Sequence, residues 1–294
     1  MDHIEENKKC MDIEENKCSS RYGKPPWIFK GSALYQFHLV KADIARAIIP
    51  KEFRLVQAFG YTLGGFFLAD YSESPFGPFD ELVVIAGIVW NPPTSHAWAA
   101  RVYVNSEEAC KHGRKEFGLP SRVATLSKGI KAISRGPKRK GNAFLSTSDV
   151  GTDSNINIRV ADINGRVATS LYDITLASPV LKTNLLKWMS MGPEIKMSLP
   201  SFSGHTEHKP QLLKYRCQIE CRVKPTLPAR VLGELDRKHT SESQNVELNE
   251  YSDKGELSRS VMLSKPILAF KFNCLKMEVE PPVVVSKGSH RPLY

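Results

Sequence analysis

One ten-residue stretch gathers side chains that could bind or transfer charge. Residues 113–122 read Gly-Arg-Lys-Glu-Phe-Gly-Leu-Pro-Ser-Arg, and they supply two guanidinium groups, Arg114 and Arg122, the carboxylate of Glu116 and the hydroxyl of Ser121. A guanidinium stays protonated in proteins, so the two arginines can pair with an anion but cannot act as nucleophiles. A carboxylate can act as a general acid or base. Arginine–glutamate pairs also commonly lock the end of a helix, so a purely structural role is the alternative for Arg114 and Glu116.

The local pattern places this stretch at a helix end. Asn105 is a suitable N-cap, and Glu108 three residues later gives a capping-box start. The helix should run to about Phe117, because Gly118 suits the left-handed position after a helix and the proline that follows prevents continuation. Residues 121–122 therefore come directly after a helix end, where an irregular backbone can present side chains to a pocket.

Short strands dominate the rest of the chain. Apolar and polar residues alternate over 34–40 and 215–223, and Leu82 to Trp90 is an apolar run of buried-strand length. Asn164-Gly165 predicts a type I′ turn within a hairpin over 155–176. The other expected elements are strands near 54–58, 61–69 and 98–104, short helices at 42–49 and 181–191, a loop or weak hairpin at 237–256, and one or two strands within 260–280.

These elements predict one mainly β domain. Short strands with few helices are typical of an antiparallel β barrel, closed or half closed. No internal boundary is visible, so we expect a single domain over 21–294. The acidic repeat in residues 1–20 has few apolar anchors and should be a disordered tail.

Composition excludes few function classes. The 294 residues carry a formal net charge of +10 and are 41% hydrophobic. No apolar run of about 18 residues is present, so no transmembrane segment is expected. A basic balance attracts anionic partners, but the basic segment 128–140 has no aromatic platform, and we expect no nucleic-acid partner.

The acidic N-terminus disfavours a cleaved transit peptide and lacks the apolar core of a secretory signal, which favours the cytoplasm.

No motif for nucleotide, metal or acyl chemistry is present. Glycine-rich phosphate loops and the zinc-protease and serine-hydrolase signatures are missing. His205 and His208 are a weak metal candidate without a second ligand cluster, and a polar loop explains them better. We therefore expect neither a metal nor another cofactor.

Several segments, in the same order over residues 25–280, resemble the acetoacetate decarboxylase-like superfamily. They are Ile49-Pro50 at the end of a short helix, the Tyr71-x-Glu73-Ser74 segment, Glu81 at the start of a strand, and Gly113-Arg114 followed by Pro120. The resemblance implies a cone-like antiparallel β fold, mainly β with a few short helices, around an internal pocket.

The resemblance departs from the decarboxylase pattern at its reacting residue. In the decarboxylases, two lysines follow the proline and the first forms a Schiff base with the substrate, which requires an amine of lowered pKa. Here Ser121 and Arg122 stand in their place. Lys115 and Lys128 lie six residues before and seven after Ser121, and nothing in the sequence suggests that either replaces the lysine. The chain should therefore not be a Schiff-base decarboxylase.

A closer resemblance links the chain to a plant branch of this superfamily that is associated with the carotenoid neoxanthin. It rests on residues 23–31, 61–69 and 89–95. It implies a role in xanthophyll formation, with a carotenoid or other small molecule as ligand and carotenoid-pathway proteins as partners. Such a role would place the chain in plastids, in conflict with the features of its N-terminus.

Two functional interpretations follow from the resemblance. In the first, the chain is an accessory or ligand-binding protein whose pocket groups pair with each other or hold a polar ligand end; these groups are Arg122, Ser121, Arg114, Glu73 and Glu81. In the second, it is an enzyme of isomerase or lyase type on a carotenoid or keto acid, with Glu81 or Glu116 as catalytic base. A structural role remains an alternative for each of these residues.

Overall fold

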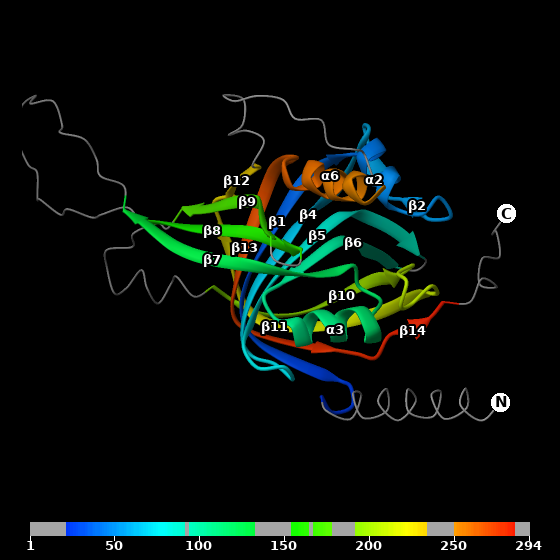
Figure 1. Cartoon of the computed structure of the whole chain (residues 1–294), viewed down its shortest axis with the longest axis horizontal. Coiled ribbons are helices and arrows are strands. Elements are labelled where there is room, and N and C mark those ends of the chain that lie inside the picture. The colour runs from blue at the N-terminus through cyan, green and yellow to red at the C-terminus, as the bar shows by residue number, and fades with distance from the viewer. Residues whose placement is uncertain are drawn as a thin grey trace, which may run out of the picture.

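The computed structural model describes residues 22–91, 94–132, 154–164, 167–177, 192–233 and 250–285. Strands form most of it (Figure 1). In chain order the elements are β1 Trp27–Lys41, α2 Ala42–Ile48, β2 Arg54–Leu55, β3 Gln57–Ala58, β4 Tyr61–Glu73, β5 Phe79–Asn91, β6 Thr94–Val104, α3 Glu107–Glu116, β7 Ser121–Ala132, β8 Ser154–Asn164, β9 Val167–Ala177, β10 Glu194–Gly204, β11 Leu212–Thr226, β12 Arg230–Gly233, α6 Glu250–Met262, β13 Lys265–Val279 and β14 Val283–Val284.

Seven strands close into a barrel. Around the wall the order is β1, β4, β5, β6, β10, β11 and β13, which returns to β1. All neighbours are antiparallel except β6 and β10, which meet in parallel through Ala97 with Ser201 and Trp98 with Phe202. The mainly β barrel predicted from the sequence is confirmed.

Strand alternation divides the core into an inner and an outer part. On β5, Val83 and Ile85 face the barrel interior, whereas Leu82 and Val84 face outward. The outward row is covered by α2 and α6, which lie side by side on the same side of the barrel (Figure 1). Side chains on both faces of this wall are therefore apolar, as in a strand covered on both sides.

Buried polar side chains of β1 also hold the outer layer. Gln36 accepts a hydrogen bond from the Ala229 amide (2.6 Å) and donates one to the Ala229 carbonyl (3.1 Å). His38 Nδ1 lies 3.1 Å from the carbonyl oxygen of Val261 at the end of α6, and its Nε2 lies 2.9 Å from Gln36 Nε2. Burial lowers the pKa of His38. A neutral His38 protonated on Nδ1 satisfies all these contacts.

A second sheet extends from the barrel. β7 begins parallel to the end of β6, with Val102 beside Ser121, and β8, β9 and β12 follow in antiparallel order. The inner face of this extension packs on the outer core through Val160 and Ile174. The extension fixes the direction in which β7 leaves the end of α3, and so the position of Ser121.

For helix α3, the predicted N-cap was wrong and the predicted C-terminal end is confirmed. The N-cap is Ser106, whose hydroxyl accepts a hydrogen bond from the Ala109 amide, and not Asn105 as predicted. Asn105 instead exchanges hydrogen bonds with Asp80 across the sheet. Gly118 has φ of +61°, the left-handed conformation predicted for it after the helix.

Two further elements differ from the prediction. Glu250–Met262 forms α6, where a loop and the start of a strand were expected, and Glu194–Gly204 forms β10, which was not predicted. The tail 1–20, Gly165 of the predicted turn and the predicted helix 181–191 lie outside the described residues. In the part of the chain that is described, no helix is long and apolar enough to cross a membrane.

Candidate functional site

The barrel encloses a cavity of about 260 Å³. All seven barrel strands and α3 contribute to its wall, and most of the side chains are aromatic or aliphatic. The polar lining groups of the described chain are Tyr35, Tyr71, Glu81, Ser95, His112, Ser121, Ser201, Tyr215 and Cys217. None of the described lining residues is lysine or arginine, so this part of the wall carries no fixed positive charge.

Glu81 is the only carboxylate among the described residues of this wall. It faces inward from β5, and its Oε2 accepts a hydrogen bond of 3.1 Å from the Tyr71 hydroxyl on β4. Burial raises the pKa of Glu81 to about 7, and the hydrogen bond from Tyr71 offsets part of the rise. Near neutral pH, Glu81 therefore exists in both forms and can either donate or accept a proton.

Three more polar groups lie near Glu81 on the opposite wall. Tyr215 and Cys217 are on β11, and Tyr215 is hydrogen-bonded to Ser201 of β10. Burial, followed by the charge of Glu81, raises the pKa of Cys217 to about 12. Burial and neighbouring charges also raise the pKa of Tyr215. Both side chains are neutral at physiological pH, so they offer hydrogen bonds rather than nucleophiles.

Ser121 lies in the cavity wall next to a glycine of α3. It is 2% exposed, opens β7, and lines the cavity together with Gly113. A Cβ atom added at Gly113 would lie 2.9 Å from Ser121 Oγ, so a larger residue there would require this hydroxyl to shift. At the position where the resemblance expects the Schiff-base lysine, the cavity thus has a small neutral alcohol.

His112 completes the end of the cavity closed by α3. It is 6% exposed and sits among aromatic rings, with centroid distances of 4.7 Å to Trp27 and 4.6 Å to Phe76. Burial lowers the pKa of His112 to about 4, so the ring is neutral at pH 7. Its Nε2 is buried and has no hydrogen-bond partner in the described part of the chain, so it is available to a ligand in the cavity.

The remaining predicted site residues lie away from the cavity lining. Arg122 follows Ser121 on a strand, so its side chain points to the other face, where its Nε is 3.1 Å from Asp162 Oδ1. Arg114 on α3 pairs with Glu207 at the surface. Glu73 pairs with Lys30 (2.6 Å), also at the surface. Glu116 is half-buried on α3 and is not among the described lining residues.

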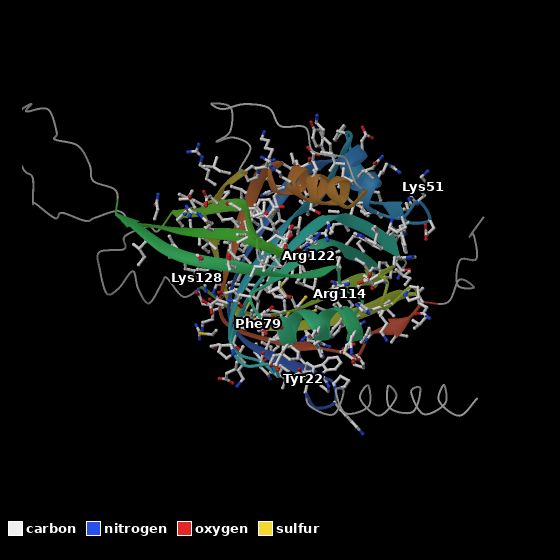
Figure 2. All side chains as sticks on the ribbon, in the orientation of Figure 1. Tyr22, Lys51, Phe79, Arg114, Arg122 and Lys128 are labelled. Carbon is white, nitrogen blue, oxygen red and sulfur yellow. The ribbon has the colours of Figure 1, made fainter. Side chains whose placement is uncertain are left out.

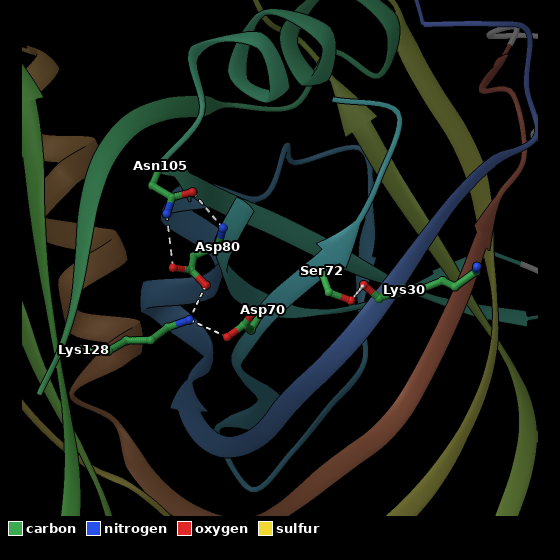
Figure 3. A network of polar contacts seen from close by, with 6 residues as sticks. All are labelled: Lys30, Asp70, Ser72, Asp80, Asn105 and Lys128. Atoms are coloured by element: carbon green, nitrogen blue, oxygen red, sulfur yellow. Dashed lines mark hydrogen bonds and ion pairs between the residues drawn. The ribbon is translucent and has the colours of Figure 1, made fainter. Parts of the chain in front are cut away.

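Neither neighbouring lysine takes over the missing amine. Lys115 is exposed on α3. Lys128 lies outside the barrel, 2.5 Å from Asp70 and 2.5 Å from Asp80, and Asp80 is in turn held by Asn105 (Figure 3). Burial alone would lower the pKa of Lys128, but the hydrogen bonds and charges of the two aspartates outweigh it and raise the pKa. A protonated lysine cannot form a Schiff base.

A metal site is not apparent in the described residues, in which no group of three or more His, Cys, Asp or Glu side chains could hold an ion. His208 lies 3.5 Å from Glu207, in the loop between β10 and β11.

The sequence pointed to Glu81 and Ser121 as pocket groups, but not to Tyr71, Tyr215, Cys217 or His112. Alternation had placed Tyr215 and Cys217 on one face of a strand. Tyr71 belongs to the Tyr71-x-Glu73-Ser74 segment that carries the family resemblance. The missing information was which face of each strand points into the barrel.

Comparison with known proteins agrees with the fold. No family model matches the chain. Acetoacetate decarboxylase from Legionella pneumophila has a TM-score of 0.51 at 14% identity and covers 91% of this chain and 90% of its own. The enduracididine biosynthesis enzyme MppR, with HEPES bound, has a TM-score of 0.52 at 12% identity, with coverage of 91% and 90%. At these identities the likeness shows a shared fold.

Sequence relatives are much more similar. The protein named neoxanthin-deficient 1 from Arabidopsis thaliana is 55% identical over 282 residues, covering 94% of this chain and 99% of the relative. Its namesakes from Solanum lycopersicum and Oryza sativa subsp. japonica are 54% and 51% identical, each over 95% of this chain and over 99% and 95% of the relatives. At such identity over nearly full length, the chain belongs to the neoxanthin-deficient 1 family.

Proposed function

We propose that this protein takes part in neoxanthin formation by holding one end of a carotenoid in the barrel cavity. The name shared by its relatives supports the pathway. The observation that carries the proposal is the cavity itself, which combines an apolar wall with a few neutral or neutralisable polar groups and has Ser121 in place of the lysine. Such a cavity suits an apolar ligand with one or two oxygens better than an anion.

The size of the cavity limits what it can enclose. Pockets for drug-sized ligands usually measure roughly 300–1,000 Å³, and this one is about 260 Å³. It can take a cyclic end group of a carotenoid, while the polyene chain would extend outside.

The polar groups are placed to bind an oxygenated end group. Protonated Glu81 can donate a hydrogen bond, and the Ser121 hydroxyl can donate or accept one. His112 Nε2 has no hydrogen-bond partner among the described residues, so a ligand hydroxyl would satisfy a group that is costly to leave buried and unpaired. Glu81 and His112 face the cavity from different elements, β5 and α3, and could hold separate oxygens of one ring.

The same charge balance disfavours a keto acid as ligand. A carboxylate substrate would enter beside Glu81, and no described lysine or arginine in the lining would compensate its charge. Burying an unpaired charge costs far more than burying a hydroxyl with a hydrogen-bond partner.

Acid–base catalysis is the second candidate function, and one observation favours it. The pKa of Glu81 is raised to about 7, and a group with a pKa near the working pH is most effective in proton transfer. Glu81 would then move a proton during isomerisation of the bound end group, and Tyr71 would position it.

Purified protein incubated with violaxanthin, alone and with plastid extract, tests both candidates. We expect binding, seen as a shift in the carotenoid absorption spectrum, and we expect Ser121→Phe to abolish it by filling the cavity. Ser127→Phe, at an exposed serine of the same strand, is the matched control. Conversion by protein alone that is lost in Glu81→Gln would identify an enzyme; binding without conversion would identify an accessory protein.

In the plant, loss of the gene should lower neoxanthin while violaxanthin accumulates. Unchanged pigments, together with no violaxanthin binding, would contradict the proposal.

A further inference from the structure

The turn between β3 and β4 carries an aromatic residue where the backbone favours a small polar one. Phe59 and Gly60 connect Ala58 to Tyr61 and have φ of 52° and 79°. Two positive φ values define a type I′ turn, in which asparagine, aspartate or glycine is strongly preferred. Phe59 is 100% exposed, so packing against the described residues does not explain its presence. A strained, exposed aromatic side chain points to a contact outside the chain.

Phe59 is the tip of a larger apolar surface, which we call the hairpin patch. It also includes Val56 (42% exposed), Tyr61 (41%), Leu63 (38%) and Trp90 (38%). The backbone keeps these residues together: β3 pairs with β4, β2 pairs with β5 next to Trp90, and the Val56 amide bonds to the Ile88 carbonyl (2.8 Å).

The hairpin patch lies at one end of the barrel. Trp90 is two residues beyond Ile88 on β5, and Leu63 is on the same face of β4 as Phe67; Ile88 and Phe67 both line the cavity. The inward-facing rows of these strands thus continue to Leu63 and Trp90, which are partly exposed. The patch therefore borders the end of the barrel opposite Glu81.

Basic side chains flank the hairpin patch. Lys41, Arg46, Lys51 and Arg54 are all exposed, against two exposed acids, Asp43 and Glu52, in the same stretch. Lys41 pairs across the sheet with Tyr61, and Arg54 pairs with Trp90. Arg46 Nη2 donates to Gln57 Oε1 (3.1 Å), next to the turn. Lys51 lies at the outer edge of the molecule (Figure 2).

We propose that the hairpin patch docks this protein on the surface of an anionic lipid bilayer, with Phe59 inserted among the acyl chains. Three features favour a bilayer over a second protein surface. Phe59 projects as a single tip, Tyr61 and Trp90 are the residue types enriched at membrane–water interfaces, and lysines and arginines beside them match an anionic surface. The patch would set the end of the barrel against the bilayer. This inference does not depend on the ligand of the cavity.

Flotation of the full chain with lipid vesicles tests the inference. One set of vesicles contains phosphatidylcholine alone, and the other contains phosphatidylcholine with phosphatidylglycerol. We expect binding to the second set, weaker binding to the first, and release by salt, because charge attraction is screened. Phe59→Asn should weaken binding about tenfold or more, since a buried aromatic side chain contributes at least as much to partitioning.

The same substitution separates docking from folding. Asparagine suits the left-handed turn position better than phenylalanine does, so Phe59→Asn should leave the melting temperature unchanged or raise it. Ile130→Asn is the matched control, because Ile130 is 77% exposed on β7, on the opposite side of the molecule from β2 (Figure 1). This variant should bind vesicles as the unchanged protein does.

Three outcomes would overturn the inference. The unchanged protein could fail to float with either set of vesicles, or Phe59→Asn could float as well as the unchanged protein. Alternatively, sedimentation could show a dimer that Phe59→Asn converts to a monomer, which would make the patch an interface between two copies of the chain.

Discussion

Glu81→Gln should change how the stability of this protein depends on pH. The substitution keeps the shape of the side chain and an oxygen that can accept the Tyr71 hydrogen bond, but removes the ionisable group. The pKa of Glu81 is 4.5 in the unfolded chain and about 7 in the folded protein. Each unit of pKa difference corresponds to about 1.4 kcal/mol, so ionising Glu81 costs about 3 kcal/mol more in the folded protein than in the unfolded chain.

The direction of the effect follows from the raised pKa. Below pH 4.5, Glu81 is protonated in both states and costs nothing. As the pH rises from 4.5 to about 7, the unfolded chain ionises first, so the unchanged protein loses stability relative to Glu81→Gln. Above pH 7 the loss is complete. The free energy of unfolding of Glu81→Gln minus that of the unchanged protein should then be about 3 kcal/mol larger than it is at low pH.

Urea unfolding of both proteins at pH 5, 6, 7 and 8 measures this difference directly. Buried histidines such as His112 also titrate, but they are shared by both proteins and cancel in the comparison. A difference between the two free energies of unfolding that stays constant with pH would refute the assignment of a raised pKa to Glu81. A difference that moves the other way would mean that Glu81 is held in its ionised form.

Two further predictions concern the missing amine and the end of α3. Borohydride added to the protein with acetoacetate should trap no adduct, because Lys128 is ion-paired outside the barrel and no described lysine lines the cavity; mass spectrometry that finds an adduct on any lysine would contradict this. Gly118→Ala should lower the free energy of unfolding by about 2 kcal/mol, since its φ is +61° and the new Cβ would lie 2.8 Å from Lys209 Cβ. Gly255→Ala in α6, with nothing within 4 Å of its new Cβ, should instead be neutral or stabilising; equal effects of the two changes would refute the argument.

Alternation in the sequence predicted β1 and β11, because the two faces of each strand have different surroundings, and an apolar run of strand length predicted β5. The failures lie where tertiary contacts outweigh local preference. β10 contains Pro200, Gly204 and several serines, and its extended form depends on the long ladder with β11. α6 is polar and includes Gly255, yet its last turn buries Val261 and Met262 against the outer core. Neither interaction is visible in the local sequence.

The site was predictable in part for a similar reason. Residue types and the resemblance pointed to Glu81 and Ser121, both of which line the cavity. Arg122 was expected to share that pocket because an irregular backbone was predicted there. In the structure β7 begins at Ser121, and the pleat sends adjacent side chains to opposite faces. Where a strand begins thus decides which of two adjacent polar residues can meet a ligand.

The parallel contact between β6 and β10 has a consequence for the order of folding. It joins the two halves of the wall through only two residue pairs, about one hundred positions apart in the chain. Short-range antiparallel ladders such as β4–β5 and β10–β11 can form before this contact. Closing a long loop costs chain entropy, and the few contacts between β6 and β10 offset little of that cost. We therefore expect the barrel to exist first as an open, curved sheet, and its interior to be sealed from water in the last step.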